Sequence, residues 1–206
     1  MLLTEWVEDL RIEVPAAIDR TIARALTFAL QEFFRDSEAW RLSEDLSLVV
    51  GEVEYYLSLP SNTYIASLDF AYISSDSVAK TKLIHTLPER IDHDVEGLPT
   101  YIAAVQDKVV VDCVSEPVDA SIGVVVQPNR NVTEIPDLLA DKWFEYIRAG
   151  ALMRLTSMSQ KDWTDAAAAQ AHAMTFNYGI EKAKREAREY RSRPKRSVKF
   201  NKSFAW

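Results

Sequence analysis

The spacing of apolar residues changes twice along the chain, and this change restricts the fold more than any other feature of the sequence. Between residues 16 and 40, apolar side chains recur every three or four positions, as on one face of an amphipathic helix. Between residues 46 and 132 they alternate in short, β-branched runs bounded by glycine or proline. From Pro136 the helical spacing returns. This order of helix, strands and helices predicts an α+β protein.

The first helix is predicted from about Ala16 to Trp40. Pro15 precedes it, and proline suits a helix start because the first turn needs no backbone N–H. Phe33 and Phe34 make the segment more apolar than a solvent-facing helix requires, so most of its apolar face is expected to lie in a core. The residues of that face are Ile18, Ile22, Ala25, Leu26, Ala29 and Phe33.

Residues 46–132 predict about six or seven short strands. Gly51 is expected to form a turn between the first two strands. Pro60 is expected to end the second, because proline cannot donate to a strand ladder. Many short strands with regular turn signals are typical of a sandwich or a rolled sheet, and we expect a small antiparallel β-sandwich.

Two more helices are predicted after Pro136, and the short connection between them favours an antiparallel α-hairpin. The second helix contains four consecutive alanines at residues 166–169. Ser159 and Asp162 are its candidate N-caps, because their side chains can accept hydrogen bonds from the first backbone N–H groups. The helix is expected to end before Pro194.

These elements predict three parts. Residues 1–45 and 133–191 are expected to form a helical bundle, in which the N-terminal helix packs on the long C-terminal α-hairpin. Residues 46–132 are expected to form a β-module inserted into that bundle. Residues 192–206 are expected to form an extended C-terminal arm, because Pro194 stops the helix.

Charge is distributed very unevenly along the chain. Residues 182–206 carry ten cations against two acids, whereas residues 1–181 carry 14 cations against 29 acids, a net charge of −15. An acidic body repels nucleic acid, which argues against tight wrapping of DNA by the folded part. No apolar run is long enough to span a bilayer, and Cys113, the single cysteine, is expected to be a buried thiol. We expect a cytosolic product with no membrane association.

Few residues are candidates for chemistry. His85, Asp92, His93 and Asp94 form the only concentration of histidine and aspartate, but their spacing in a loop does not place ligands on one rigid face. His172, alone on the last helix, is expected to serve packing or to lie at the surface. We find no phosphate loop, dinucleotide fingerprint, nucleophile elbow or zinc spacing. We therefore expect no enzymatic activity, metal or cofactor; the alternative is an enzyme with its site in the loop at residues 85–97.

Three stretches together resemble the head-to-tail adaptor proteins of tailed bacteriophages, also called connector or tail tubular proteins. They are "AIDRTIARALTFALQEFFRDSEAWR", "LVVGEVEYYLSLPSNTYIASL" and "IPDLLADKWFEYIRAGALMRLTSMSQKDWTDAAAAQAHAMTFNYGIEKAK". The last is similar to the long hairpin of that family, with its Ile-Pro entry, its Gly-Ala-Leu segment and an alanine-rich second helix. The resemblance rests on the order and spacing of all three stretches, which cover most of the chain.

The resemblance implies a structural protein of the virion neck that is made in the host cytoplasm and has no catalytic role. Such adaptors form a ring, expected here to contain twelve subunits, beneath the portal protein. The ring extends the DNA channel and presents a platform to a downstream tail or nozzle protein. Genomic DNA is expected to pass through without specific binding, because an acidic wall does not hold phosphates.

The family's C-terminal segment commonly runs into clefts between portal subunits, which would explain the composition of this arm. Its cations would be steered to an acidic surface, and its aromatic side chains would fill pockets. One alternative is a nucleic-acid- or scaffold-binding assembly protein that acts through this tail; another is a solvated basic terminus. The predicted portal-binding residues are Arg191, Arg193, Lys195, Arg196, Lys199, Phe200, Lys202, Phe204 and Trp206.

Overall fold

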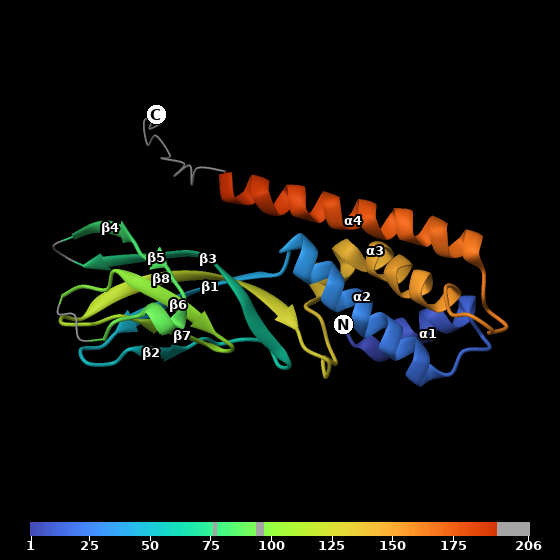
Figure 1. The fold of residues 1–206 in the computed structure, drawn as a ribbon, viewed down its shortest axis with the longest axis horizontal. Helices are drawn as coiled ribbons and strands as arrows, with labels where there is room; N and C mark the ends of the chain where they lie inside the picture. Colours follow the sequence, from blue (N-terminus) through green and yellow to red (C-terminus); the bar gives the residue numbers. More distant parts are fainter. Residues whose placement is uncertain (76–77, 94–96, 193–206) are drawn as a thin grey trace, which may run out of the picture.

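A computed structural model describes residues 1–75, 78–93 and 97–192, which form a helical half and a β-half placed end to end (Figure 1). The helices are α1 (Leu3–Glu13), α2 (Asp19–Ser37), α3 (Asp137–Thr156) and α4 (Ala166–Ser192). The strands are β1 (Arg41–Leu48), β2 (Glu54–Tyr56), β3 (Thr63–Ser75), β4 (Val78–Lys82), β5 (Ile84–His85), β6 (Tyr101–Val105), β7 (Lys108–Val111) and β8 (Val118–Pro128), with a short 3-10 helix, η1 (Pro88–Arg90). The predicted α+β class is confirmed.

Helix α1 was not predicted from the sequence. It forms because Leu3, Trp6 and Leu10 recur at a spacing of three and four residues and bury one face of the helix. The Trp6 ring packs edge-on against Phe144 of α3, with 4.8 Å between ring centroids. The chain before α1 is held by Leu3, whose backbone N–H donates to the carbonyl oxygen of Thr133. The N-terminus thus lies beside the segment that joins β8 to α3.

Helix α2 lies within the predicted range of residues 16–40 and contacts the other three helices. Ile22, Leu26 and Phe33 are fully buried, as the apolar stripe predicted. Ile18 is an exception, because it precedes the first helical residue and is 68% exposed. The helix ends at Ser37, and the left-handed backbone of its C-cap, Glu38 (φ 53°), turns the chain toward β1.

Helices α3 and α4 form the predicted hairpin, and two glycines allow their close approach. A Cβ atom at Gly150 would lie 2.5 Å from the Phe176 ring, and one at Gly179 would lie 2.3 Å from Tyr146. The predicted caps of α4 were wrong. Asp165, rather than Ser159 or Asp162, accepts a hydrogen bond from the first turn, at 2.9 Å from the backbone nitrogen of Ala168.

The β-half contains two four-stranded sheets, with the strand orders β1-β8-β3-β4 and β2-β7-β6-β5. The described residues contain eight strands rather than six or seven, and the first starts at Arg41, five residues before the predicted region. All pairs are antiparallel except β5–β6, which is parallel. Gly51 forms the predicted turn (φ 81°), and this turn carries the chain from one sheet to the other.

The apolar core is continuous from the helices into both sheets. Residues of all four helices and of both sheets belong to one cluster of buried side chains, which includes Trp6, Phe33, Trp143, Val109 and Val124. Because this cluster runs through both halves, the helices and the sheets pack against each other.

Substitution of Gly150 by alanine tests the packing of the hairpin. Alanine is favoured over glycine in a helix by about 1 kcal/mol, but the added methyl group would overlap the buried Phe176 ring. We therefore expect Gly150→Ala to lower the free energy of unfolding by about 1–3 kcal/mol in urea denaturation. Phe176→Leu should reduce that loss in a double-mutant cycle. Stabilisation by Gly150→Ala would show that the two helices do not approach this closely.

Candidate functional site

Arg41, the first residue of β1, fastens the C-terminal part of α4 to the β-half. Its Nη1 donates to the carbonyl oxygen of Ala187 at 2.9 Å and lies 3.3 Å from Oδ2 of Asp69 on β3. Its Nε donates to the carbonyl oxygen of Glu38. The Arg41 and Asp69 side chains are only 13% and 7% exposed, so water screens their attraction little. The end of α4, from which the C-terminal arm departs, is therefore held over the start of β1.

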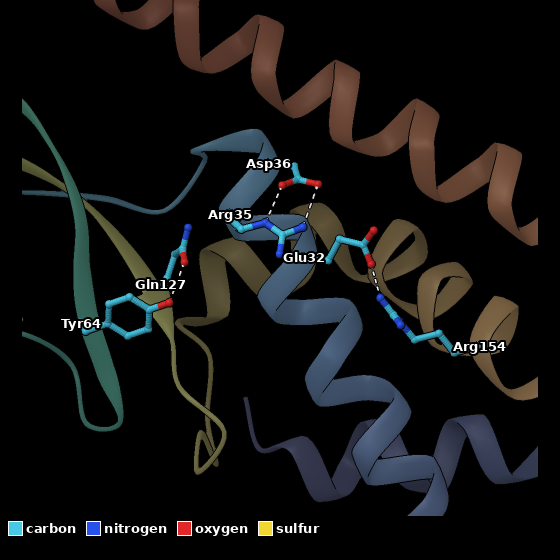
Figure 2. A network of polar contacts seen from close by, with 6 residues as sticks. All are labelled: Glu32, Arg35, Asp36, Tyr64, Gln127 and Arg154. Carbon is cyan, nitrogen blue, oxygen red and sulfur yellow. Dashed lines mark hydrogen bonds and ion pairs between the residues drawn. The ribbon is translucent and has the colours of Figure 1, made fainter.

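Hydrogen bonds and ion pairs also lie along the C-terminal half of α2 (Figure 2). Arg35 donates to both carboxylate oxygens of Asp36, at 2.8 and 3.4 Å, and this bonding raises the pKa of Arg35. Glu32 forms an ion pair with Arg154 of α3. Glu32, Arg35 and Asp36 line an open hollow of about 520 Å³ between α2 and α4. The hollow carries charges of both signs and suits polar contacts rather than catalysis.

The sheet side of this junction is polar as well. Tyr64 of β3 donates to Oε1 of Gln127 on β8 at 2.8 Å (Figure 2). Gln31 of α2 donates to the carbonyl oxygen of Pro128 at 3.3 Å. The first bond joins β3 to β8, and the second, which is partly buried, links α2 to the sheet.

Among the predicted portal-binding residues, Arg191 belongs to a described element, the last turn of α4. The others lie outside the described residues: Arg193, Lys195, Arg196, Lys199, Phe200, Lys202, Phe204 and Trp206. Their role stays a prediction. The structure shows where the end of α4, which precedes these residues, lies: near the junction between the helical half and the β-half (Figure 1).

The histidines and aspartates of the loop do not converge. His85 lies in β5, Asp92 and His93 follow η1, and Asp94 is outside the described residues. Nδ1 of His93 lies 3.2 Å from the carbonyl oxygen of Asp112, so this ring fastens the loop to the end of β7. Within residues 1–75, 78–93 and 97–192, no three His, Cys, Asp or Glu side chains are arranged to hold a metal ion.

Asp112 is a buried acid that sequence reasoning missed, although an acid inside the apolar run "VVVDCV" is a signal. Its side chain accepts hydrogen bonds from the backbone nitrogens of Thr100 at 3.0 Å and Tyr101 at 3.2 Å, and so joins β7 to β6. Cys113 is buried, as predicted, and burial raises the pKa of its thiol. A protonated thiol that donates to the Gly97 carbonyl is a structural group rather than a nucleophile.

His172 on α4 does not have the environment of a general base. Partial burial, together with the positive charge of Arg148, lowers the pKa of His172. No carboxylate orients its ring in the hydrogen bonds of the described residues, whereas a catalytic histidine usually has such a partner. The packing role expected for His172 fits this position.

A comparison with protein families identifies the family of this chain. The model of the SU10 adaptor protein family matches residues 2–198, which include both halves of the molecule. The chain belongs to the SU10 adaptor protein family. This is a family of phage head-to-tail adaptors, so the predicted resemblance is confirmed. A search of curated proteins found no match.

Membership of this family makes the protein a structural adaptor of a bacteriophage and places it in the virion neck. A structural role agrees with the arrangement of the titratable groups above, which serve packing and bracing. None of the described helices has the length and hydrophobicity needed to cross a membrane.

Replacement of Arg41 tests the brace that positions the end of α4. Arg41→Met keeps the length of the side chain but removes the shielded ion pair with Asp69 and the bond to Ala187. We expect the free energy of unfolding to fall by about 3 kcal/mol in urea denaturation. The control is Arg35→Met, which removes an exposed pair and should cost less than about 1 kcal/mol. Equal losses in the two variants would contradict the bracing role.

Proposed function

We propose that this adaptor forms a ring of twelve subunits below the portal, extends the DNA channel, and carries the tail or nozzle protein on its distal side. The observation that carries the proposal is the family match over residues 2–198. The net charge of −15 on residues 1–181 supports a channel wall over which DNA slides without being held. Nothing in this role needs a catalytic group.

The outer stripe of α4 supports contacts between subunits. Ala167, Ala171, Met174 and Tyr178 recur at helical spacing and are exposed, opposite the buried face that carries Phe176. Met174 and Tyr178 are 64% and 62% exposed and so offer apolar surface to a neighbouring subunit. Small residues beside them permit a neighbouring helix to approach closely. We assign this stripe to the interface between adjacent subunits of the ring.

Attachment to the portal is assigned to the C-terminal arm. Residues 193–206 contain five cations, three aromatic side chains and no acid. Cations draw a peptide to an acidic surface, and aromatic anchors concentrate binding energy in pockets. The arm departs from an end of α4 that Arg41 holds in place, so its point of departure is fixed relative to the sheets.

A substitution that introduces a charged side chain into the outer stripe of α4 tests whether this stripe forms the contacts between subunits. Ala171→Arg should leave the stability of the subunit unchanged, because the side chain faces solvent, but should prevent assembly on the portal. Ala16→Arg, at an exposed alanine just before α2 and away from the stripe, is the matched control. Free wild-type protein should elute as a monomer in size-exclusion chromatography, with rings in electron micrographs when portal is added. Normal rings with Ala171→Arg would exclude this stripe from the interface.

Deletion of residues 193–206 separates attachment to portal from the alternative, binding of nucleic acid or scaffold through the tail. The truncated subunit should fold, because the core lies within the described helices and sheets, but it should no longer co-sediment with portal. Replacement of Phe200, Phe204 and Trp206 by alanine should weaken co-sedimentation while all cations are retained. Loss of DNA binding with intact binding to portal would favour the alternative function.

A further inference from the structure

The outer face of the sheet β1-β8-β3-β4 contains a shallow hollow of about 370 Å³ that the adaptor role does not explain. Asp45 and Ser47 of β1, Asp119 and Ser121 of β8, and Tyr72 of β3 line it. In the antiparallel register, Ser121 lies opposite both Asp45 and Tyr72, and Asp119 lies opposite Ser47. These side chains therefore share one face of the sheet, away from the core.

Two serines line this hollow, and each donates a hydrogen bond to one of its two carboxylates. Ser121 donates to Asp45, and Ser47 donates to Oδ1 of Asp119 at 2.9 Å. Each carboxylate keeps further lone pairs for a ligand. Neither takes part in an ion pair among the described residues, although Lys80 of β4 borders the hollow. With Asp45, Asp119 and Lys80 in its lining, the hollow carries a net negative charge that can attract a cationic ligand.

An aromatic surface adjoins the two acids. Phe70 lies opposite Gly123 in the register, and its ring occupies the place of the missing side chain, 2.3 Å from where a Cβ atom would stand. The Tyr72 ring lies 5.8 Å from that of Phe70. Carboxylates beside one exposed and one partly buried aromatic ring suit an extended peptide that alternates cations with apolar or aromatic side chains.

The end of α4 lies over the same face of the sheet. Arg41, Ser43, Asp45 and Ser47 alternate along β1, so all four side chains project from one face, and that of Arg41 reaches the carbonyl oxygen of Ala187 on α4. Asp45 is four residues from Arg41, which is about 13 Å along a strand. The 14 residues after Ser192 can span about 46 Å when extended. The chain beyond α4 therefore reaches the whole hollow.

We propose that the hollow on the outer face of β1-β8-β3-β4 binds the C-terminal segment 193–206 of the same chain before assembly. Asp45 and Asp119 take cations of the sequence "RPKRSVKFNKSFAW", while Phe70 and Tyr72 pack against its aromatic and aliphatic side chains. Bound in this way, the segment is kept from other contacts until a site of higher affinity binds it. The inference does not depend on which partner finally binds the arm, because it concerns the free subunit alone.

A disulfide test in the full-length chain examines this docking. Ser74 lines the hollow on β3 and is exposed, so Ser74→Cys combined with Ser203→Cys should form an intramolecular disulfide under mild oxidation. Asp45→Asn with Asp119→Asn should reduce its yield several-fold, as should high salt, because both weaken the attraction. Thermal unfolding of each variant checks that the fold is retained.

The control pairs Ser203→Cys with Asp107→Cys, an exposed position between β6 and β7 on the other sheet. Ser203→Cys alone measures any reaction with Cys113, which is buried. A yield no higher than that of the control pair would overturn the proposal. Disulfide-linked dimers in place of the intramolecular product would also overturn it, because they would place the arm on a second copy. Neither result bears on binding to portal, so the two proposals fail separately.

Discussion

The structure depends on one aromatic cluster at the C-terminal end of α2. Phe33 lies 5.6 Å from Trp143 of α3 and 6.2 Å from Phe176 of α4, measured between ring centroids, and Phe34 lies 5.2 Å from Trp40, which leads into β1. These rings are completely buried, so their packing contributes several kcal/mol each through burial alone. The cluster joins three helices to the start of the first sheet. It is the reason why two halves of different secondary structure share one core, and why the end of α4 has a fixed place beside β1.

Much of this fold could be predicted because burial and spacing coincide. The stripe around Ile22, Leu26 and Phe33 indicated α2, and Gly51 indicated the turn that leads to β2. Helix α1 was missed, since Leu3, Trp6 and Leu10 make only a short apolar pattern within 11 residues. The N-cap of α4 was misplaced because several polar residues precede the alanines, and only the three-dimensional path of the chain selects Asp165. The parallel pairing of β5 with β6 depends on long-range contacts that periodicity does not encode.

The candidate sites also divide into those visible in local sequence patterns and those that depend on long-range contacts. Sequence reasoning discounted the loop at residues 85–97, because consecutive ligands in a loop do not lie on one rigid face. It could not find the brace of Arg41, Asp69 and Ala187, whose members are far apart in the sequence and meet only in the folded chain. The hollow around Asp45 and Asp119 was equally hidden, since it exists only in the register of β1 with β8. Charge asymmetry, in contrast, is visible in the sequence alone, and it separates an acidic body from a basic arm.

In the proposed role, an acidic body braced by Arg41 presents a basic, aromatic peptide to a partner. Family membership establishes the adaptor, and the position of α4 gives the arm a defined origin. The most direct measurement is a cryo-electron microscopy map of the assembled neck at side-chain resolution. The account predicts density for residues 193–206 in an extended conformation between portal subunits, with Phe200, Phe204 and Trp206 enclosed. A map in which these residues project into solvent, with the portal held by other surfaces, would contradict it.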